Sequence, residues 1–154
     1  MQNSGDFQSI KSVALRYQDA LAAAAPGDVA GVLDAFTGPG YHCYAVHPFG
    51  LMEGTGAVAN TLWAPLKSQW TALQRRPFMF MAGVNEIDGS QWVISAGVFM
   101  GLLDGDWLGI PASGNRVEFK IVSIYRIIDN KLAEFWGLQD EMALRNQLSG
   151  DLED

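Results

Sequence analysis

The sequence predicts an α+β domain, a cone in which a curved mixed or antiparallel sheet wraps around N-terminal helices and leaves a pocket between them. Helical periodicity dominates the first 70 residues, whereas long strand-like runs follow one another from residue 78 to residue 139. Turn residues separate these runs at the spacing of hairpins. Such a sheet buries its apolar face, and we expect the N-terminal helices to pack against that face.

Two helices are predicted before residue 40. The first ends at Pro26-Gly27, and the second follows Asp28 as its N-cap and ends at Gly38-Pro39-Gly40. Apolar residues at helical spacing define the buried side of the first helix: Ile10, Val13, Ala14, Tyr17 and Leu21. A third helical segment covers residues 54–70, where Pro65 is expected to kink or restart the helix.

Strands are predicted at residues 41–46, 78–87, 91–103, 117–128 and 131–139. The short first strand closes at His47-Pro48, because the residue before a proline is extended. Asp88-Gly89 and Asp129-Asn130 are expected to form hairpin turns, since Asp, Asn and Gly tolerate positive φ. A loop rich in turn residues covers 103–114, and a short helix is expected at 141–148.

Length and charge narrow the classes of function. A chain of 154 residues fits one domain, 1–154, with a frayed tail at 151–154. The net charge of −7 argues against binding to nucleic acid or to an anionic membrane surface, both of which attract clustered Lys and Arg. The sequence shows no membrane-spanning run, no signal-peptide pattern and a single cysteine, Cys43. We therefore expect a cytoplasmic protein.

The last hairpin predicts which residues face the pocket. Side chains alternate along a strand, so a tip at Asp129-Asn130 fixes the residues that share one face. The pairs expected on that face are Ile127 with Leu132, Tyr125 with Glu134, Ser123 with Trp136, and Phe119 with Asp140. A carboxylate in this mostly apolar space must be paired or have a raised pKa, because desolvation disfavours its charge.

Several short motifs in the C-terminal half resemble the SnoaL-like polyketide cyclases of the NTF2-like superfamily. Residues 109–114 (Gly-Ile-Pro-Ala-Ser-Gly) resemble a family loop, and residues 126–136 resemble its strand pair Arg-x-x-Asp-Gly-Lys-Ile-x-Glu-x-Trp. Asp140, followed by Gln147-Leu148-Ser149-Gly150, is similar to the family ending. Upstream, His47-Pro48 and residues 63–66 (Trp-Ala-Pro-Leu) are similar to the related ester cyclases.

This resemblance implies an NTF2-like cone, no cofactor, a small apolar or polyketide-like ligand, and a homodimer, which we expect to form through the convex face of the sheet. In the cyclases, an aspartate at the position of Asp140 acts as general acid/base in an aldol ring closure. Two residues depart from the family pattern. Phe99 stands where a histidine is common, and Asn130 replaces the hairpin glycine.

The two candidate catalytic residues are Asp140 and His47. Burial would raise the pKa of Asp140 toward neutrality and suit it to general acid/base work. The alternative is that Asp140 is the N-cap of the following helix. His47 is the better placed histidine, and its alternative is a structural role. No metal site is expected, because His42 and His47 lack the spacing of two ligands on one element.

The expected substrate-binding residues line the same face. They are Tyr125, Trp136, Glu134, Phe99, Ser123 and Phe119. Tyr125 is a candidate donor to a substrate carbonyl, and Glu134 a candidate second carboxylate. The alternative for the aromatic residues is an ordinary core position, and the alternative for Glu134 is a hydrogen bond to Tyr125.

Three functions remain open from the sequence. The first is a cyclase or isomerase of the SnoaL type that uses Asp140 on a small, largely apolar carbonyl compound. The second is a non-catalytic module that binds such a ligand, which Phe99 favours. The third is a dimerisation protein whose pocket has collapsed, and the volume of the cavity separates it from the other two.

Overall fold

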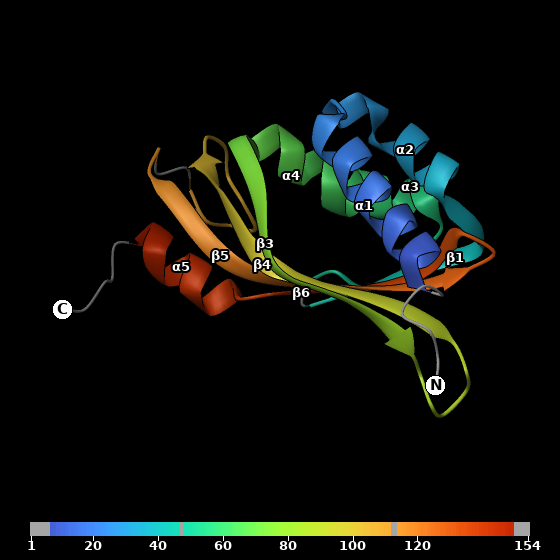
Figure 1. Cartoon of the computed structure of the whole chain (residues 1–154). Coiled ribbons are helices and arrows are strands. Elements are labelled where there is room, and N and C mark those ends of the chain that lie inside the picture. Colours follow the sequence, from blue (N-terminus) through green and yellow to red (C-terminus); the bar gives the residue numbers. More distant parts are fainter. Residues whose placement is uncertain (1–6, 47, 112–113, 150–154) are drawn as a thin grey trace.

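The computed structural model describes residues 7–46, 48–111 and 114–149. It has the predicted α+β architecture, with helices from the N-terminal part lying over one face of a six-stranded curved sheet (Figure 1). The prediction of the fold class is therefore confirmed. The sheet is mixed, because β1 runs parallel to β6 while every other neighbouring pair is antiparallel.

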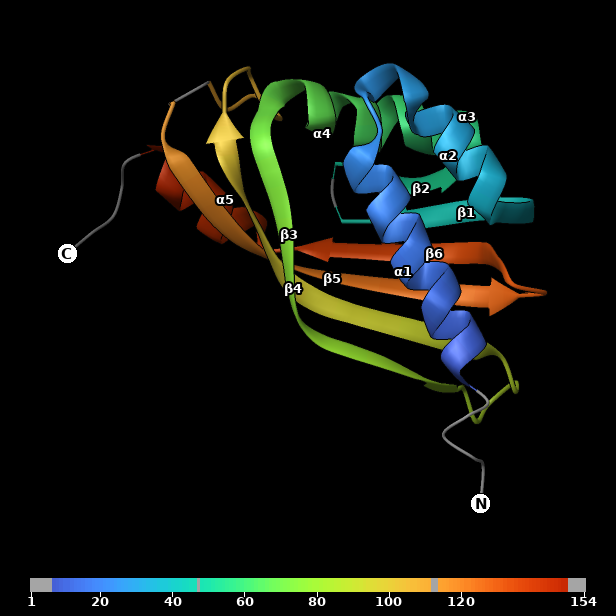
Figure 2. The ribbon, with the colours of Figure 1, turned by 45° about the horizontal axis from the view of Figure 1, so that its top comes forward.

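The strands lie in the order β2-β1-β6-β5-β4-β3, which Figure 2 shows across the sheet. Their bounds are Thr37–Ala45 (β1), Gly50–Glu53 (β2), Trp70–Val84 (β3), Gln91–Leu103 (β4), Arg116–Ile128 (β5) and Lys131–Gln139 (β6). Strands β3 and β4 are long and bend toward the helices, so the sheet closes around them (Figure 2).

Helices α1 (Gln8–Ala23) and α2 (Val29–Phe36) cross the concave face, joined by a 3-10 turn at Pro26–Asp28. A second helical segment follows β2, and Pro65 restarts it as predicted. Its parts are α3 (Thr55–Val58), a π-helical turn at Ala59–Trp63 and α4 (Ala64–Gln69). Helix α5 (Glu141–Ser149) packs beside β5, where the side chain of Gln147 hydrogen-bonds the backbone of Glu118.

One strand prediction is wrong in extent, and one strand was missed. β3 begins at Trp70 and not at residue 78, and β2 was not predicted. The first half of β3 breaks the apolar alternation with Arg75, Arg76 and Pro77, and its pairing with β4 is interrupted by two register shifts. Because of these irregularities, the sequence pattern does not predict the first half of β3, although its inward residues belong to the interior of the cone.

The core lies between the helices and the concave face. Its largest fully buried side chains include Tyr17 of α1, Leu33 of α2, Tyr125 of β5 and Leu132 of β6. Tyr125 stacks on Phe135 with 5.3 Å between ring centroids. Large aromatic side chains therefore fill most of the space that the sequence predicted to be a pocket.

The hairpin between β5 and β6 has the predicted tip, but its register shifts by one residue. Asp129 and Asn130 adopt φ values of 51° and 57°, as a two-residue turn requires. Ile127 pairs with Leu132, but Arg126 pairs with Glu134, so Ala133 is an extra residue in β6. Since side chains alternate, this β-bulge turns every later side chain of β6 to the face opposite to the predicted one.

Cys43 on β1 gives a prediction for alkaline solutions. Its thiol is fully buried, and burial raises its pKa from 9.0 to about 12. Between these values the unfolded chain loses the proton while the folded chain keeps it, so stability falls as pH rises above 9. We expect a loss of about 1 kcal/mol from pH 9 to pH 10 in urea unfolding, because half of the unfolded thiols are already ionised at pH 9. The Cys43→Ala variant should show a smaller decrease, and an equal decrease would contradict this account.

Candidate functional site

Arg75 of β3 is a half-buried cation in the interior of the cone. Its guanidinium donates to Ser123 Oγ at 3.2 Å and lies over the ring of Phe99, 4.8 Å from the ring centroid. Ser123 is 3% exposed and is one of two buried polar residues in the described chain. Because neither contact supplies a negative charge, the guanidinium keeps an uncompensated charge in an aromatic environment.

Two small cavities flank Arg75. One, of about 40 Å³, lies toward β6 and the 99–111 region, and the other, of about 60 Å³, lies toward α1 and α4. Both are lined by Trp63, Leu66, Arg75 and Phe99. The side chain of Arg75 therefore stands on the boundary between them. We call them the β6 cavity and the α1 cavity.

Three residues that line the β6 cavity each have a buried hydrogen-bond donor without a partner among the described residues. These donors are the indole Nε1 of Trp63, the indole Nε1 of Trp107 and the amide Nε2 of Gln139. Trp63 is 5% exposed and Trp107 is 3% exposed. A buried donor without an acceptor costs about 1–3 kcal/mol, so a site of this kind is satisfied by a ligand that brings oxygen acceptors.

The predicted inward residues of β4 and β5 lie where the sequence placed them. Phe99 lines both cavities, Ser123 contacts Arg75, and Phe119 is buried beside Phe99. Tyr125 is 1% exposed, and its hydroxyl accepts a hydrogen bond from Gln18 Nε2 at 2.9 Å. Tyr125 is therefore part of the core next to the site and does not line either cavity.

Tyr17 and Tyr41 lie in the same buried region. Burial raises the pKa of both phenols well above 10, and the nearby phenol of Tyr125 adds to the effect. Both stay protonated at neutral pH. The interior thus presents O–H and N–H donors and one guanidinium rather than an ionised base.

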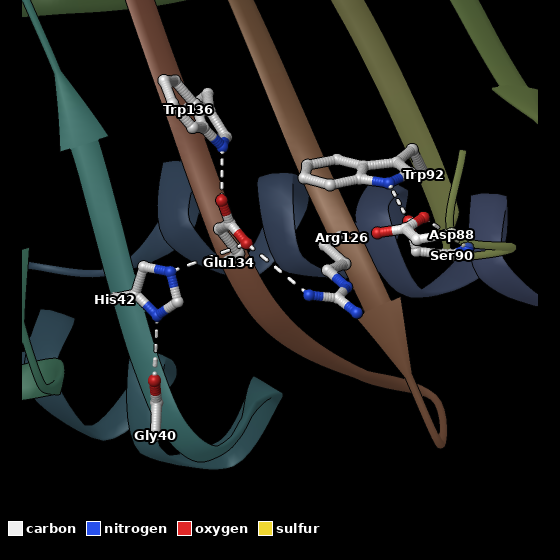
Figure 3. Close-up of polar contacts among 8 residues, drawn as sticks. All are labelled: Gly40, His42, Asp88, Ser90, Trp92, Arg126, Glu134 and Trp136. Atoms are coloured by element: carbon white, nitrogen blue, oxygen red, sulfur yellow. Dashed lines mark hydrogen bonds and ion pairs between the residues drawn. The ribbon is translucent and has the colours of Figure 1, made fainter. Parts of the chain in front are cut away.

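Glu134 and Trp136 do not face the interior, and that prediction is wrong. The bulge at Ala133 turns both to the convex face, where Trp136 is 39% exposed (Figure 3). Glu134 accepts a hydrogen bond from Trp136 Nε1 at 2.6 Å and pairs with His42 at 3.5 Å and Arg126 at 3.9 Å. Glu134 is therefore the acceptor of an outer polar network and not a second carboxylate beside Tyr125.

This outer network borders a wide open groove of about 760 Å³ on the convex face. The groove is lined mainly by apolar side chains, among them Met81, Trp92, Ile94, Ile124 and Trp136. Figure 3 shows Glu134, Arg126 and Trp92 on adjacent strands, with Trp136 two residues further along β6. This groove on the face away from the helices is thus much larger than the two cavities beside Arg75.

Asp140 does not lie in the apolar cavity in which the sequence analysis placed it. It is exposed, and its Oδ1 accepts a hydrogen bond from the backbone N–H of Ala143 at 3.0 Å. Its side chain is therefore the N-cap of α5, which was the alternative reading. His47 lies outside the described residues, so its role stays a prediction.

The N-cap role of Asp140 predicts a specific pattern of stabilities. The Asp140→Ala variant should lose about 1 kcal/mol of unfolding free energy, because the first turn of α5 loses its acceptor. The Asp140→Asn variant should stay close to the original protein, since asparagine caps helices equally well. Urea unfolding curves of the three proteins measure this. Equal stability of the alanine variant would contradict the cap.

Sequence reasoning missed Arg75, Trp107 and Gln139. Arg75 was seen as one of an adjacent arginine pair, but its strand was expected to start three residues later. In the structure Leu73 and Arg75 are half-buried and alternate with exposed neighbours, a pattern that the residue types alone do not show. In the unbulged pairing expected from the hairpin tip, Gln139 lies on the face opposite to Leu132, and the bulge at Ala133 turns it inward.

Two searches of the described part of the chain give negative results. No group of three or more His, Cys, Asp or Glu side chains is arranged to hold a metal ion there. No helix within residues 7–46, 48–111 and 114–149 is long and apolar enough to cross a membrane.

A family model described as SnoaL-like polyketide cyclase matches residues 85–148. The match covers β4, β5, β6 and nearly all of α5, so it includes the motifs that carry the resemblance in sequence. The predicted resemblance is confirmed over this part of the chain. A search of curated proteins finds no significant match.

Solved structures share the fold over nearly the whole chain. A SnoaL-like polyketide cyclase from Agrobacterium tumefaciens has a TM-score of 0.67 and 18% identity, and covers 92% of this chain and 98% of its own. TsrD from Streptomyces laurentii has a TM-score of 0.69 and 21% identity, with 92% and 97% covered. An NTF2-like protein from Burkholderia thailandensis has a TM-score of 0.66 and 12% identity, with 94% and 98% covered. The NTF2-like fold is therefore established.

Proposed function

From this NTF2-like fold and its SnoaL-like C-terminal part, we propose that the chain binds a small, largely apolar carbonyl compound of polyketide-like character beside Arg75. The observation that carries the proposal is the set of donors without acceptors around the β6 cavity, next to a guanidinium without a carboxylate. A carbonyl oxygen supplies the missing acceptor, while Phe99 and Trp63 contact the apolar body of the ligand.

The same arrangement favours chemistry at the carbon next to the carbonyl. When that carbon loses a proton, negative charge develops on the carbonyl oxygen. A guanidinium and buried N–H groups stabilise this enolate more strongly than the neutral ketone, which lowers the barrier. Cyclisation and isomerisation of polyketide-like compounds share this step.

Removal of the proton also requires a base. The sequence favoured Asp140 for this step, and we now propose His47, the other candidate catalytic residue. The residues that precede and follow His47-Pro48, Val46 and Phe49, both line the β6 cavity. Asp140 is committed to the N-cap of α5, so we expect Asp140→Asn to leave the reaction unchanged. This expectation separates the two candidates that the sequence provided.

The two cavities are small, which by volume alone matches the collapsed pocket of the dimerisation protein, and Arg75 stands between them. Their volumes of about 40 and 60 Å³ are well below the roughly 300 Å³ of a typical ligand pocket. Arg75 is held by one hydrogen bond to a hydroxyl and by a ring contact, so its long side chain can turn at modest cost. We propose that a ligand displaces it from Ser123 and joins the two cavities.

Exchange of the methyl protons of acetophenone in D₂O, followed by ¹H NMR, tests this function. The protein should accelerate the exchange, and Arg75→Met should reduce the acceleration by about 10²-fold, the usual cost of removing an oxyanion donor. Arg76→Met is the matched control, because Arg76 is the exposed neighbour on the same strand. Equal loss in both variants, or no loss in Arg75→Met, would contradict the role of Arg75.

We also propose that the convex face forms a homodimer. One row of residues crosses all six strands through paired positions: Leu51, Tyr44, Trp136, Ile124, Ile94 and Met81. Leu51 is 53% exposed and Met81 is 50% exposed, so the row is an apolar stripe open to solvent. We call it the convex row. Sedimentation velocity over a concentration series should show a dimer.

A further inference from the structure

The charges around the two cavities are all of one sign. Arg75 lines both cavities, and Lys67 lines the α1 cavity. The described residues that line either cavity include no Asp, Glu or His. The charge around the two cavities is thus positive, whereas the net charge of the whole chain is −7. Such a site attracts an anion.

Neither cation is neutralised by a neighbouring carboxylate. The ion pairs among the described residues are His42–Glu134, Arg126–Glu134 and Arg145–Glu141, and all lie outside the cavities. Lys67 Nζ donates to two backbone carbonyls, Leu21 O at 2.8 Å and Ala22 O at 3.1 Å. Burial lowers the pKa of Lys67, because its charge is desolvated without a counter-ion.

The two cavities share Trp63 and Arg75 and differ in their other polar residues. Lys67 and Gln18 line only the α1 cavity, whereas Trp107 and Gln139, each with an unpartnered N–H group, line only the β6 cavity. A charged oxygen group is best placed between Lys67 and Arg75. A neutral carbonyl oxygen is best placed against the indole and amide donors.

We infer that the ligand is a small oxo acid, whose carboxylate lies in the α1 cavity between Lys67 and Arg75 and whose carbonyl group and apolar body reach the β6 cavity. This inference rests on the proposed function and narrows its ligand from carbonyl compounds in general to those with a carboxylate. Arg75 then contacts both ends, since it lines both cavities.

Phenylpyruvate and its methyl ester are a matched pair of probes, since they share the ring and the ketone and differ in the negative charge. Isothermal titration should give phenylpyruvate at least a tenfold tighter dissociation constant than its ester. Lys67→Gln and Arg75→Gln should each bring the two constants to within about threefold of one another, while Arg76→Gln keeps the difference. Added salt should weaken the binding of phenylpyruvate and leave that of the ester unchanged.

Lys67 also holds the last carbonyls of α1, so Lys67→Arg is included as a variant that keeps the charge. The Lys67→Arg variant should still bind phenylpyruvate more tightly than its ester. If the role of Lys67 were purely structural, the Lys67→Gln variant would also keep this preference for the acid. An ester that binds as tightly as the acid overturns the inference. If the proton exchange of acetophenone then still depends on Arg75, only the inferred carboxylate of the ligand is wrong. If neither the exchange nor the binding of any probe depends on Arg75, the proposed function is wrong too.

Discussion

Replacing Gly97 by alanine should lower the free energy of unfolding by about 3 kcal/mol, at the upper end of the usual cost of overpacking. A Cβ at Gly97 would overlap the carbonyl oxygen of Arg76 and lie 2.8 Å from Cα of Pro77. Both obstacles are backbone atoms of β3, so no side chain can turn away to make room. Relief requires β3 to separate from β4 where the two strands bend.

Gly83→Ala is the matched control for this prediction. Gly83 lies on β3 of the same strand pair, and a Cβ there meets no atom within 4 Å. Urea unfolding should therefore place Gly83→Ala within about 0.5 kcal/mol of the original protein. If the two variants were equally stable, the close approach of β3 to Gly97 would be refuted. Because Arg75 is two residues from Pro77, the Gly97 variant should also weaken ligand binding.

Replacing Trp136 by glutamate should shift the proposed dimer to monomers, with a dissociation constant raised by about 10²-fold or more. Trp136 stacks on Tyr44 at 4.3 Å between ring centroids and stands near the middle of the convex row. A two-fold contact through this row would bring the two new carboxylates into one apolar interface, where their desolvation and mutual repulsion oppose association.

Leu15→Glu provides the control for this experiment. Leu15 is 44% exposed, similar to Trp136, but it lies on α1 and not on the sheet. Sedimentation velocity should show a dimer for Leu15→Glu and a monomer for Trp136→Glu, with circular dichroism showing that both are folded. A dimer in both variants would place the interface elsewhere on the protein.

The fold was predictable because its signals are local and repeated. Asp129-Asn130 supports positive φ, Pro65 restarts a helix, and the apolar periodicities of the first helix and the later strands are regular. These features agreed with one another and with the family motifs. The structure accordingly has the predicted cone, with the helices on the concave face.

The site was not predictable to the same degree, because its orientation depends on one residue. The pairing of β5 and β6 was predicted correctly at Ile127 and Leu132, and it fails at the next pair, where Ala133 bulges. Nothing in the residues around Ala133 signals a bulge, since an alanine fits a regular strand as well. One extra residue moved Glu134 and Trp136 out of the interior and turned Gln139 into it.

The central claim is that ligand binding occurs inside the cone, beside Arg75, and not in the groove of the convex face. Indole N–H resonances report on both places, because Trp63 and Trp107 line the β6 cavity while Trp92 and Trp136 line the groove. In a titration of ¹⁵N-labelled protein with acetophenone, the N–H signals of Trp63 and Trp107 should shift and those of Trp92 and Trp136 should stay in place. Shifts confined to Trp92 and Trp136 would contradict the account.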